Sequence, residues 1–244
     1  MKLLIVRHGD PDYERDSLTP KGWREAEYLS RRLENAGIKA AYVSPLGRAK
    51  DTASLTLKKI GIAGRECLWL REFDTHIWRP DVRDHQKIAW DWLPQDWTRE
   101  ERFFSYDQWY DVPVMAQGRV KEEYDWVVDG LDQVLKDHGY VRDGHFYRAV
   151  NASNDAIAFF CHFGVECVLL SHLLNISPMV LWHGFCAPPS SVTTLITEER
   201  RQGIAYFRMN GFADISHLYA NDEPPSFAAR FCETYENSWE RHDD

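Results

Sequence analysis

The chain has 244 residues, of which 44% are hydrophobic and 27% charged, a composition typical of a globular protein with one large domain. Its aromatic content of 14% excludes a disordered chain, and no apolar run approaches the roughly 20 residues that cross a bilayer, which excludes a spanning membrane protein. The formal net charge of -9 argues against nucleic acid as a partner, because phosphate backbones select basic surfaces.

The amino-terminal segment predicts a buried strand and not a secretion signal. Residues 2–6 form a short apolar run that stops at Arg7 and His8. The hydrophobic part of a signal peptide needs about 7 to 15 residues. We therefore expect a cytoplasmic protein.

The first 73 residues predict alternating strands and helices. Thr19 is a suitable N-cap and Pro20 suits the first turn of a helix that ends before Gly37. The next elements are a strand, a helix and a strand, expected at residues 40–43, 46–59 and 67–70. This order is typical of a parallel sheet covered by helices.

Residues 74–121 interrupt that order, and we interpret them as an inserted cap region. Five of the ten tryptophans lie in it, at positions 78, 90, 92, 97 and 109. A crossover between parallel strands needs far fewer residues. We expect most of these aromatic side chains to form a small core of the insertion, and one or two to face a substrate.

Regular patterns return after the insertion. They predict a helix over 122–138, a hairpin over 140–150, a strand over 156–161, an apolar helix over 165–174, and strands over 192–197 and 204–209. Residues 219–244 form a carboxyl-terminal tail that we expect to be solvated after Asn221. The fold predicted for residues 1–244 is a single α/β domain, a three-layer α/β/α sandwich with a mostly parallel central sheet.

Polar clusters follow three of the predicted strands. Arg7 and His8 follow the first strand, Arg48 lies in the first turn of the helix after the second, and His162 follows the strand over 156–161. Ligands bind at the carboxyl ends of strands in open parallel sheets. These two arginines and two histidines are therefore expected to meet in one cleft.

Such a cluster suits a phosphate group. A guanidinium matches phosphate oxygens, and the first helical turn at Arg48 also favours an anion. Neighbouring cations lower the pKa of His8, which keeps one ring nitrogen free to attack phosphorus. The carbonyl of Gly9 is suitably placed to hold the other ring N–H.

Each of these signals is weak alone, because an isolated histidine at a strand end is more often structural. Together they resemble the histidine phosphatase superfamily, which includes the cofactor-dependent phosphoglycerate mutases. The matching segments are residues 7–9, 18–23 and 44–53, His162, and later residues 191–193 and 216–218. The resemblance covers roughly residues 1–73 and 122–218.

The resemblance implies a two-step transfer in which His8 takes a phosphoryl group and water or a second acceptor removes it. Arg7, Arg48 and His162 would stabilise the charge on the phosphoryl oxygens. Glu72 matches the family's acid position and would protonate the leaving oxygen. The alternative for Glu72 is a salt bridge with a nearby arginine such as Arg71.

Three departures from the family pattern favour phosphomonoester hydrolysis. Phe163 replaces the more usual glycine after His162, so its backbone N–H can still bind phosphate while its side chain reshapes the pocket wall. No aspartate follows His162, which leaves Glu72 as the proton donor. Residues 74–78 lack the glycine-rich segment common in the mutases, and residues 10–13 likewise lack the residues that grip phosphoglycerate in mutases. The alternatives are a phosphoglycerate mutase-like phosphotransferase and a non-catalytic phosphate-binding module.

The expected partner is a small phosphorylated substrate, and the sequence leaves the oligomeric state open. The mechanism needs no cofactor, and no H-x-x-x-H pattern or carboxylate cluster indicates a metal. His76 and His85 are expected at the surface, and His172 is expected to be structural. The five cysteines, at positions 67, 161, 167, 186 and 232, lack C-x-x-C spacing and are expected to be small buried residues without disulfides.

Overall fold

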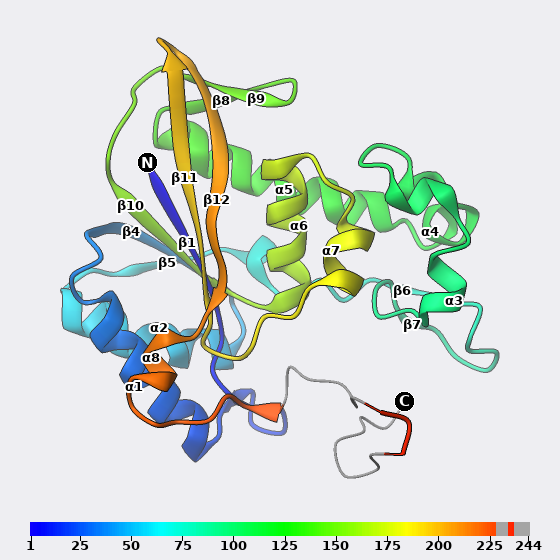
Figure 1. Ribbon diagram of the computed structural model, residues 1–244, viewed down its shortest axis with the longest axis horizontal. Helices are drawn as coiled ribbons and strands as arrows, with labels where there is room; N and C mark the ends of the chain where they lie inside the picture. Colours follow the sequence, from blue (N-terminus) through cyan, green and yellow to red (C-terminus); the bar gives the residue numbers. More distant parts are fainter. Residues whose placement is uncertain (228–233, 237–244) are drawn as a thin grey trace.

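The computed structural model describes residues 1–227 and 234–236. Its centre is an eight-stranded sheet with the strand order β5-β4-β10-β1-β11-β12-β9-β8 (Figure 1). In chain order the strands are β1 (Lys2–Arg7), β4 (Ile38–Val43), β5 (Gly64–Glu66), β8 (Tyr140–Asp143), β9 (Phe146–Ala149), β10 (Ala156–Cys161), β11 (Val192–Arg201) and β12 (Ile204–Asp214). Strands β5, β4, β10 and β1 are parallel, and the pairs from β1 through β11 to β8 are antiparallel.

Helices cover both faces of this sheet (Figure 1). The longer helices are α1 (Pro20–Leu33), α2 (Gly47–Ile60), α5 (Val120–Asp137), α6 (Phe163–Leu174) and α7 (Pro178–Gly184). The shorter elements are α3 (Pro94–Trp97), α4 (Pro113–Gln117), α8 (Ser216–Tyr219) and the strand pairs β2 (Pro11–Asp12) with β3 (Ser17–Leu18) and β6 (His76–Ile77) with β7 (Lys87–Ile88). The predicted three-layer α/β fold is confirmed, with its parallel strands gathered in one half of the sheet.

The alternation of side chains along β1 separates two hydrophobic cores. Leu3 and Ile5 belong to the larger core, which includes residues of α5 and α6. Leu4 and Val6 belong to the smaller core, which includes residues of α1 and α2. Because successive side chains of a strand point to opposite faces, the two cores lie on the two sides of the sheet. The central strand β1 is therefore buried on both faces, as its continuous apolar sequence predicts.

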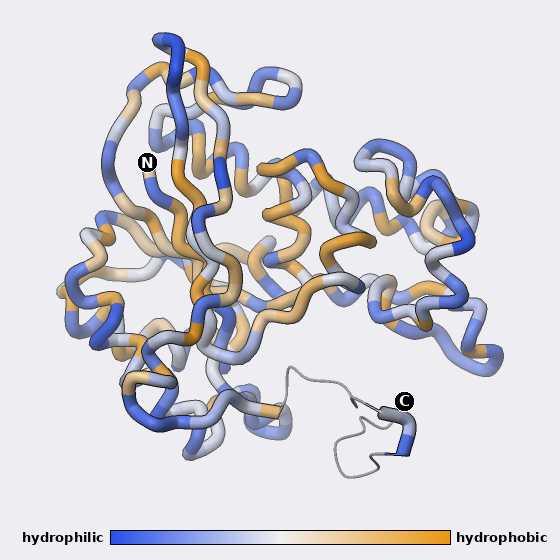
Figure 2. The backbone as a smooth tube through the Cα atoms, in the orientation of Figure 1, coloured by the Kyte–Doolittle hydropathy of each residue, from blue (hydrophilic) through white to orange (hydrophobic). Residues whose placement is uncertain are grey.

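Two local predictions about helices are confirmed, one by a hydrogen bond and one by burial. The side chain of Thr19 caps α1 by accepting a hydrogen bond from the Gly22 backbone N–H at 3.1 Å. Helix α6 is hydrophobic along its length (Figure 2), and most of its residues are buried. A helix that is apolar all round has to be enclosed by the protein. Because α6 is buried, its amino-terminal end is held close to the carboxyl end of β10, which it follows after one residue.

The strand predicted at residues 67–70 is wrong. The strand beside β4 is β5 (Gly64–Glu66), and Leu68–Leu70 forms a 3-10 helix. The ladder with β4 ends at Glu66, after which the Leu70 backbone N–H donates to the Cys67 carbonyl at 3.1 Å. Leu70 is apolar because it is buried in the larger core and not because it lies in the sheet. The turn directs the following residues across the end of the sheet.

The insertion does not form a separate small core. Trp92, Phe103 and Trp109 are buried in the same cluster as α5 and α6. Trp109 makes edge-to-face contacts with Tyr124 of α5 and with Trp182 of α7, at ring-centroid distances of 5.4 and 5.7 Å. The large aromatic rings span the gap between the insertion and the domain, so the two share one continuous core. Helix α7, which the sequence analysis missed, provides part of this contact.

The carboxyl-terminal tail is only partly solvated where the structure describes it. Glu223 forms ion pairs with Lys21 at 2.7 Å and Arg24 at 3.0 Å on α1. The hydroxyl of Ser226 donates to the Asp10 carboxylate, and Ser226 is buried. The prediction of a solvated segment after Asn221 is therefore wrong for Glu223 and Ser226, whereas Asp222 and Pro224 are exposed. Residues 228–233 and 237–244 lie outside the described part.

The cysteines follow the sequence prediction with one exception. Cys67, Cys161 and Cys167 are buried and form no disulfide. Cys186 is exposed, because it lies in the loop after α7, and Cys232 lies outside the described residues. Within residues 1–227 and 234–236, no helix is both long and apolar enough to cross a membrane.

Candidate active site

The pairing of β1 with β10 brings the two predicted histidines together. Arg7 lies opposite Cys161 in this parallel ladder, and the His8 backbone N–H donates to the Cys161 carbonyl at 3.0 Å. His8 and His162 therefore follow the ends of neighbouring strands. Their imidazole rings lie 5.0 Å apart between centroids.

His8 is held as a neutral ring with one nitrogen fixed. Its Nδ1 lies 2.8 Å from the Gly9 carbonyl oxygen, as the sequence predicts. A carbonyl only accepts, so Nδ1 carries the proton and Nε2 keeps a lone pair. Burial and the positive charges of Arg7 and Arg48 hold the pKa of His8 well below its usual range. The ring therefore stays neutral and nucleophilic at neutral pH.

His162 is fixed by Ser44, which follows β4. The Ser44 hydroxyl lies 2.7 Å from Nε2 of His162. The other ring nitrogen, Nδ1, is buried and has no hydrogen-bond partner among the described residues. Burial, the repulsion that a protonated His8 would exert, and the positive charge of Arg48 hold the pKa of His162 well below its usual range. An unpaired buried nitrogen is costly unless a ligand satisfies it.

Arg7 is the cation closest in sequence to His8, and it is mostly buried. One guanidinium nitrogen, Nη1, donates to the Ala187 carbonyl. Nε is buried and has no partner among the described residues. The guanidinium carbon lies 5.8 Å from the centre of the Phe163 ring. Arg7 is therefore oriented by the loop before β11 and still has donor capacity for an anion.

Arg48 lies in the first turn of α2 and is positioned by a carboxylate that the sequence analysis missed. Asp16 accepts from Nη1 of Arg48 at 2.7 Å and from the Gly47 backbone N–H at 2.6 Å. Nε of Arg48 is buried without a partner in the described part of the chain. Asp16 has a φ of 48°, in the left-handed region that Asp tolerates better than most residues. This turn gives Asp16 its reach to α2.

Glu72 lies beside the first turn of α6. Its Oε1 accepts hydrogen bonds from the backbone N–H groups of Phe73 at 2.8 Å and Val165 at 3.1 Å. Burial raises the pKa of Glu72, although these hydrogen bonds and Arg7 act in the opposite direction. The alternative of an ion pair with Arg71 is not found, because Arg71 pairs with Glu123 at 2.8 Å.

A glycine permits this close approach of Glu72 to α6. A Cβ atom at Gly164 would lie 2.7 Å from Oε1 of Glu72 and 2.9 Å from Nε1 of Trp90. Trp90 comes from the insertion, and its Nε1 donates to the Phe73 carbonyl at 2.7 Å. The insertion therefore reaches the acid through Trp90, whereas its other tryptophans lie in the larger core or, like Trp78, are exposed.

Phe163 is partly exposed at the start of α6. Its ring meets that of Trp90 edge to face at a centroid distance of 6.0 Å. The sequence analysis named Phe163 as a pocket-wall residue but could not select Trp90 among five tryptophans. Ser44 and Asp16 were also missed as supports, although both follow strand or turn signals close to the predicted cations.

The remaining histidines agree with their predicted places. His76 and His85 are exposed, and His172 is buried with its Nε2 2.9 Å from the Asp132 carboxylate. Across the described part of the chain, no three His, Cys, Asp or Glu side chains are grouped so that they could hold a metal ion.

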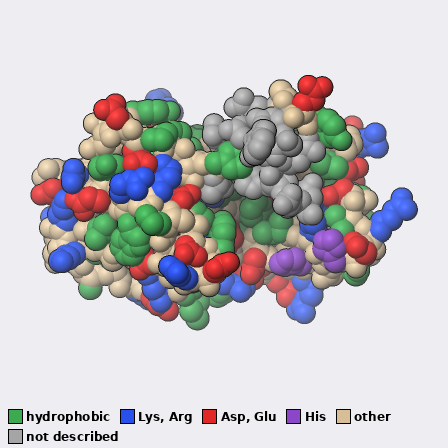
Figure 3. Space-filling view, turned by 90° about the horizontal axis from the view of Figure 1, so that it is seen from below, with side chains coloured by type: hydrophobic (Ala, Val, Ile, Leu, Met, Phe, Trp, Pro, Cys, Tyr) green, Lys and Arg blue, Asp and Glu red, His purple; other side chains and the backbone are tan. Residues whose placement is uncertain are grey.

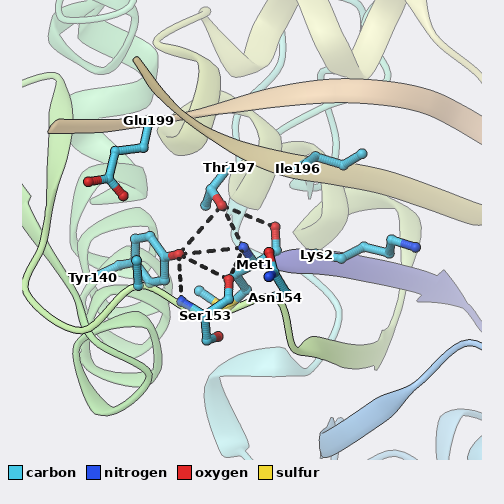
Figure 4. A pocket seen from close by; sticks show the side chains of 9 residues that line it. Met1, Lys2, Tyr140, Ser153, Asn154, Ile196, Thr197 and Glu199 are labelled. Atoms are coloured by element: carbon cyan, nitrogen blue, oxygen red, sulfur yellow. Dashed lines mark hydrogen bonds between the residues drawn. The ribbon is translucent and has the colours of Figure 1, made fainter. Parts of the chain in front are cut away.

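A cavity of about 280 Å³ lies at the other end of β1 and contains none of the predicted site residues (Figure 4). It is lined by Met1, Tyr140, Ser153 and Thr197, among others, which hydrogen-bond to one another. These bonds tie the start of β1 to β8 and β11. We therefore assign the chemistry to the carboxyl end of β1, where the buried donors converge.

The comparison with known families agrees with this geometry. The model of the histidine phosphatase superfamily (branch 1) matches residues 3–210. The chain therefore belongs to the histidine phosphatase superfamily.

Individual relatives are more distant. A 2,3-bisphosphoglycerate-dependent phosphoglycerate mutase of Thermoplasma acidophilum is 36% identical over 66 residues, which are 22% of this chain and 33% of that protein. The chain thus covers about a third of the length of this curated relative. The phosphoserine phosphatase of Entamoeba histolytica, solved with 3-phosphoglyceric acid, superposes with a TM-score of 0.58 at 18% identity, covering 89% of this chain and 98% of that one.

A mycobacterial glucosyl-3-phosphoglycerate phosphatase superposes with a TM-score of 0.53 at 18% identity, over 86% of this chain and 98% of its own. At these identities the superpositions show a shared fold and carry no information about substrate.

Proposed function

We propose that this protein hydrolyses phosphomonoesters through a phosphohistidine on His8. The observation that carries the proposal is the contact that fixes the buried His8 ring, close to the charges of Arg7 and Arg48. Its Nδ1 is 2.8 Å from the Gly9 carbonyl, which leaves Nε2 as the attacking atom. The superfamily match over residues 3–210 supports the same chemistry.

In the first step, Nε2 of His8 attacks phosphorus and the ester oxygen leaves. A bond forms between nitrogen and phosphorus while the bond between phosphorus and the leaving oxygen breaks. Arg7, Arg48 and Nδ1 of His162 are the groups available to bind the phosphoryl oxygens. Donors that are oriented before the reaction stabilise developing charge without a reorganisation cost.

Glu72 supplies the proton that the leaving oxygen needs. Two backbone N–H groups hold Oε1, so the proton resides on Oε2. Because burial raises the pKa of this carboxyl, a protonated fraction persists at higher pH than for an exposed glutamate. In the second step the carboxylate takes a proton from water, whose oxygen attacks phosphorus and releases phosphate and neutral His8.

A panel of phosphomonoesters, assayed without added metal, tests the proposal. The wild type should release phosphate, and His8→Ala should not. Rapid quenching should trap an acid-labile, alkali-stable phosphoryl group on the peptide that contains His8. Equal turnover by both proteins, or label found only on other peptides, would overturn the mechanism.

A phosphotransferase is the second candidate, because the match over 66 residues is to a mutase. In this case the phosphoryl group would move from His8 to a second hydroxyl of the substrate. Isomerisation that appears only after priming with a bisphosphate would favour this candidate. A protein that binds phosphate but never labels at His8 would favour a non-catalytic module. The expected substrate is a small phosphorylated molecule of the cytoplasm.

A further inference from the structure

We propose that the site prefers phosphomonoesters whose alcohol carries an apolar body, which packs against an aromatic wall formed by Phe163 and Trp90. This inference rests on the proposed function and adds the class of leaving group. It concerns the side of the site that faces Glu72, where the alcohol oxygen has to be protonated.

The wall adjoins both the proposed phosphate-binding arginine and the surroundings of the proposed acid. The centre of the Phe163 ring lies 5.8 Å from the Arg7 guanidinium carbon and 6.0 Å from the centre of the Trp90 ring. Trp90 in turn approaches the place where a Gly164 Cβ would touch Glu72. A phosphoryl group near Arg7 with its ester oxygen toward Glu72 therefore directs the alcohol along these two rings.

Trp90 is held in place by hydrogen bonds, and both rings are partly exposed. Nε1 of Trp90 is used by the Phe73 carbonyl at 2.7 Å, so the indole presents its apolar surface. Arg79 fixes the same segment by donating to the Trp90 carbonyl at 3.1 Å and the Asp91 carbonyl at 2.5 Å. Rings held in this way need little ordering when a ligand packs against them.

Two arginines close to this wall in the chain are already paired. Arg71 binds Glu123 at 2.8 Å, and Arg79 binds Asp81 at 2.7 Å. A paired guanidinium is a weak receptor for a carboxylate of the substrate, because binding it would break an existing ion pair. These two guanidinium groups are therefore engaged within the chain, and we expect an uncharged alcohol to be favoured over one that carries a carboxylate.

The surface of the molecule is consistent with this preference. Figure 3 shows the molecule from below, the direction in which the carboxyl end of β1 points. Hydrophobic side chains are visible there in a hollow between the part that contains α1 and α2 and the part that contains the insertion. An alkyl chain in such a hollow gains free energy with each methylene removed from water.

The test compares kcat/KM for hexyl phosphate, glycerol 3-phosphate and 3-phosphoglycerate. All three would form the same phosphoenzyme, so kcat/KM isolates the step in which the alcohol leaves. We expect hexyl phosphate to be preferred by tenfold or more. Phe163→Ala and Trp90→Gln should each reduce this preference several-fold, whereas Trp90→Phe should retain most of it. Equal kcat/KM for the three esters would overturn the proposal. An unchanged preference in both Phe163→Ala and Trp90→Gln would also overturn it.

Two controls separate this inference from the proposed function. Trp97→Leu alters another tryptophan of the insertion, whose ring stacks on His183 at 4.9 Å, and it should leave the preference unchanged. Inhibition constants or equilibrium binding of hexylphosphonate and methylphosphonate to the wild type report on the wall without any turnover. Tighter binding of hexylphosphonate than of methylphosphonate, without a phosphohistidine, would contradict only the proposed function. Turnover without any difference in binding between the two phosphonates would contradict only the role of the aromatic wall.

Discussion

The imidazole rings of His8 and His162 lie 5.0 Å apart and tilted by 55°, at the ends of two neighbouring parallel strands. Burial is the main reason that the pKa of each ring is lowered, and each is further lowered by cations around it. Two neutral rings can lie this close without repulsion. The positive charge of the site therefore resides on the arginines, and the rings are free to act as a nucleophile and a hydrogen-bond partner.

Loss of the Ser44 hydroxyl should weaken catalysis through His162. Ser44→Ala removes the contact of 2.7 Å to Nε2 and with it a group that orients the ring. A hydrogen bond worth about 1 kcal/mol corresponds to a fall in kcat/KM of roughly fivefold to tenfold. The matched control is Ser54→Ala on α2, whose exposed hydroxyl donates to the Asp51 carbonyl. A loss of the same size in both variants would contradict a role of Ser44 at the site.

Glu72→Gln should remove the proton donor while leaving the backbone hydrogen bonds at Oε1 possible. We expect kcat/KM for alkyl phosphates to fall by about 10² to 10⁴, and less for aryl phosphates, whose leaving oxygen needs no proton. In the wild type, the protonated carboxyl is present below its raised pKa, so activity should fall as the pH rises through that value. The pH profile of the variant should lack this alkaline limb. Retention of the limb would assign it to another group.

Asp16 should act through Arg48. Asp16→Asn keeps a side chain that tolerates positive φ but removes the negative charge 2.7 Å from Nη1. We expect KM to rise by roughly threefold to tenfold with a smaller change in kcat, because one ion-paired support of the phosphate-binding cation is lost. Glu66→Gln is the control, since its ion pair with Lys50 has the same length of 2.7 Å but is about half exposed. Equal KM values for wild type and Asp16→Asn would contradict this role.

Glu166 should make the fold less stable at alkaline pH. Burial raises the pKa of this carboxyl to about 7, with Glu72 acting in the same direction, whereas Thr193 and Arg7 lower it. The folded state therefore binds the proton more tightly than the unfolded state. The stabilising contribution of the proton is complete below about pH 4.5 and is lost as the pH rises through about 7.

Urea unfolding of wild type and Glu166→Gln at pH 5 and pH 8 measures this effect. Relative to the variant, the wild type should lose roughly 2 to 3 kcal/mol of unfolding free energy between the two pH values. Glu27→Gln is the control, since its half-exposed side chain pairs with Arg31 at the surface, and it should change by no more than about 0.5 kcal/mol. The same difference at both pH values would show that Glu166 is ionised in the folded protein even at pH 5.

The parallel half of the sheet and the candidate site residues could be predicted from the sequence for the same physical reason. Strands β1 and β10 are continuous apolar runs that end in polar residues, so their burial and their ends can both be recognised. His8 and His162 follow directly where those runs stop, and Arg48 lies in the first turn of the helix after β4. The bond from His8 to Gly9 is local, between adjacent residues, and could therefore be anticipated.

Contacts between distant segments could not be found in this way. Cys67–Leu70 is as apolar as a strand, but Leu70 is buried by packing and not by pairing in the sheet. Trp90 resembles the other tryptophans of the insertion until the fold brings it against Phe163. Side-chain periodicity reports which face is buried, and it does not report against which neighbour.

The position of β1 in the sheet also has a consequence for synthesis on the ribosome. Its Lys2 pairs with Ala156 of β10, and its Leu4 pairs with Thr194 of β11. His8, the proposed nucleophile, is thus translated early, but the strands that flank β1 emerge more than a hundred residues later. A nascent chain cannot pair both edges of β1 before β11 leaves the exit tunnel, so the candidate site is assembled only at a late stage of synthesis.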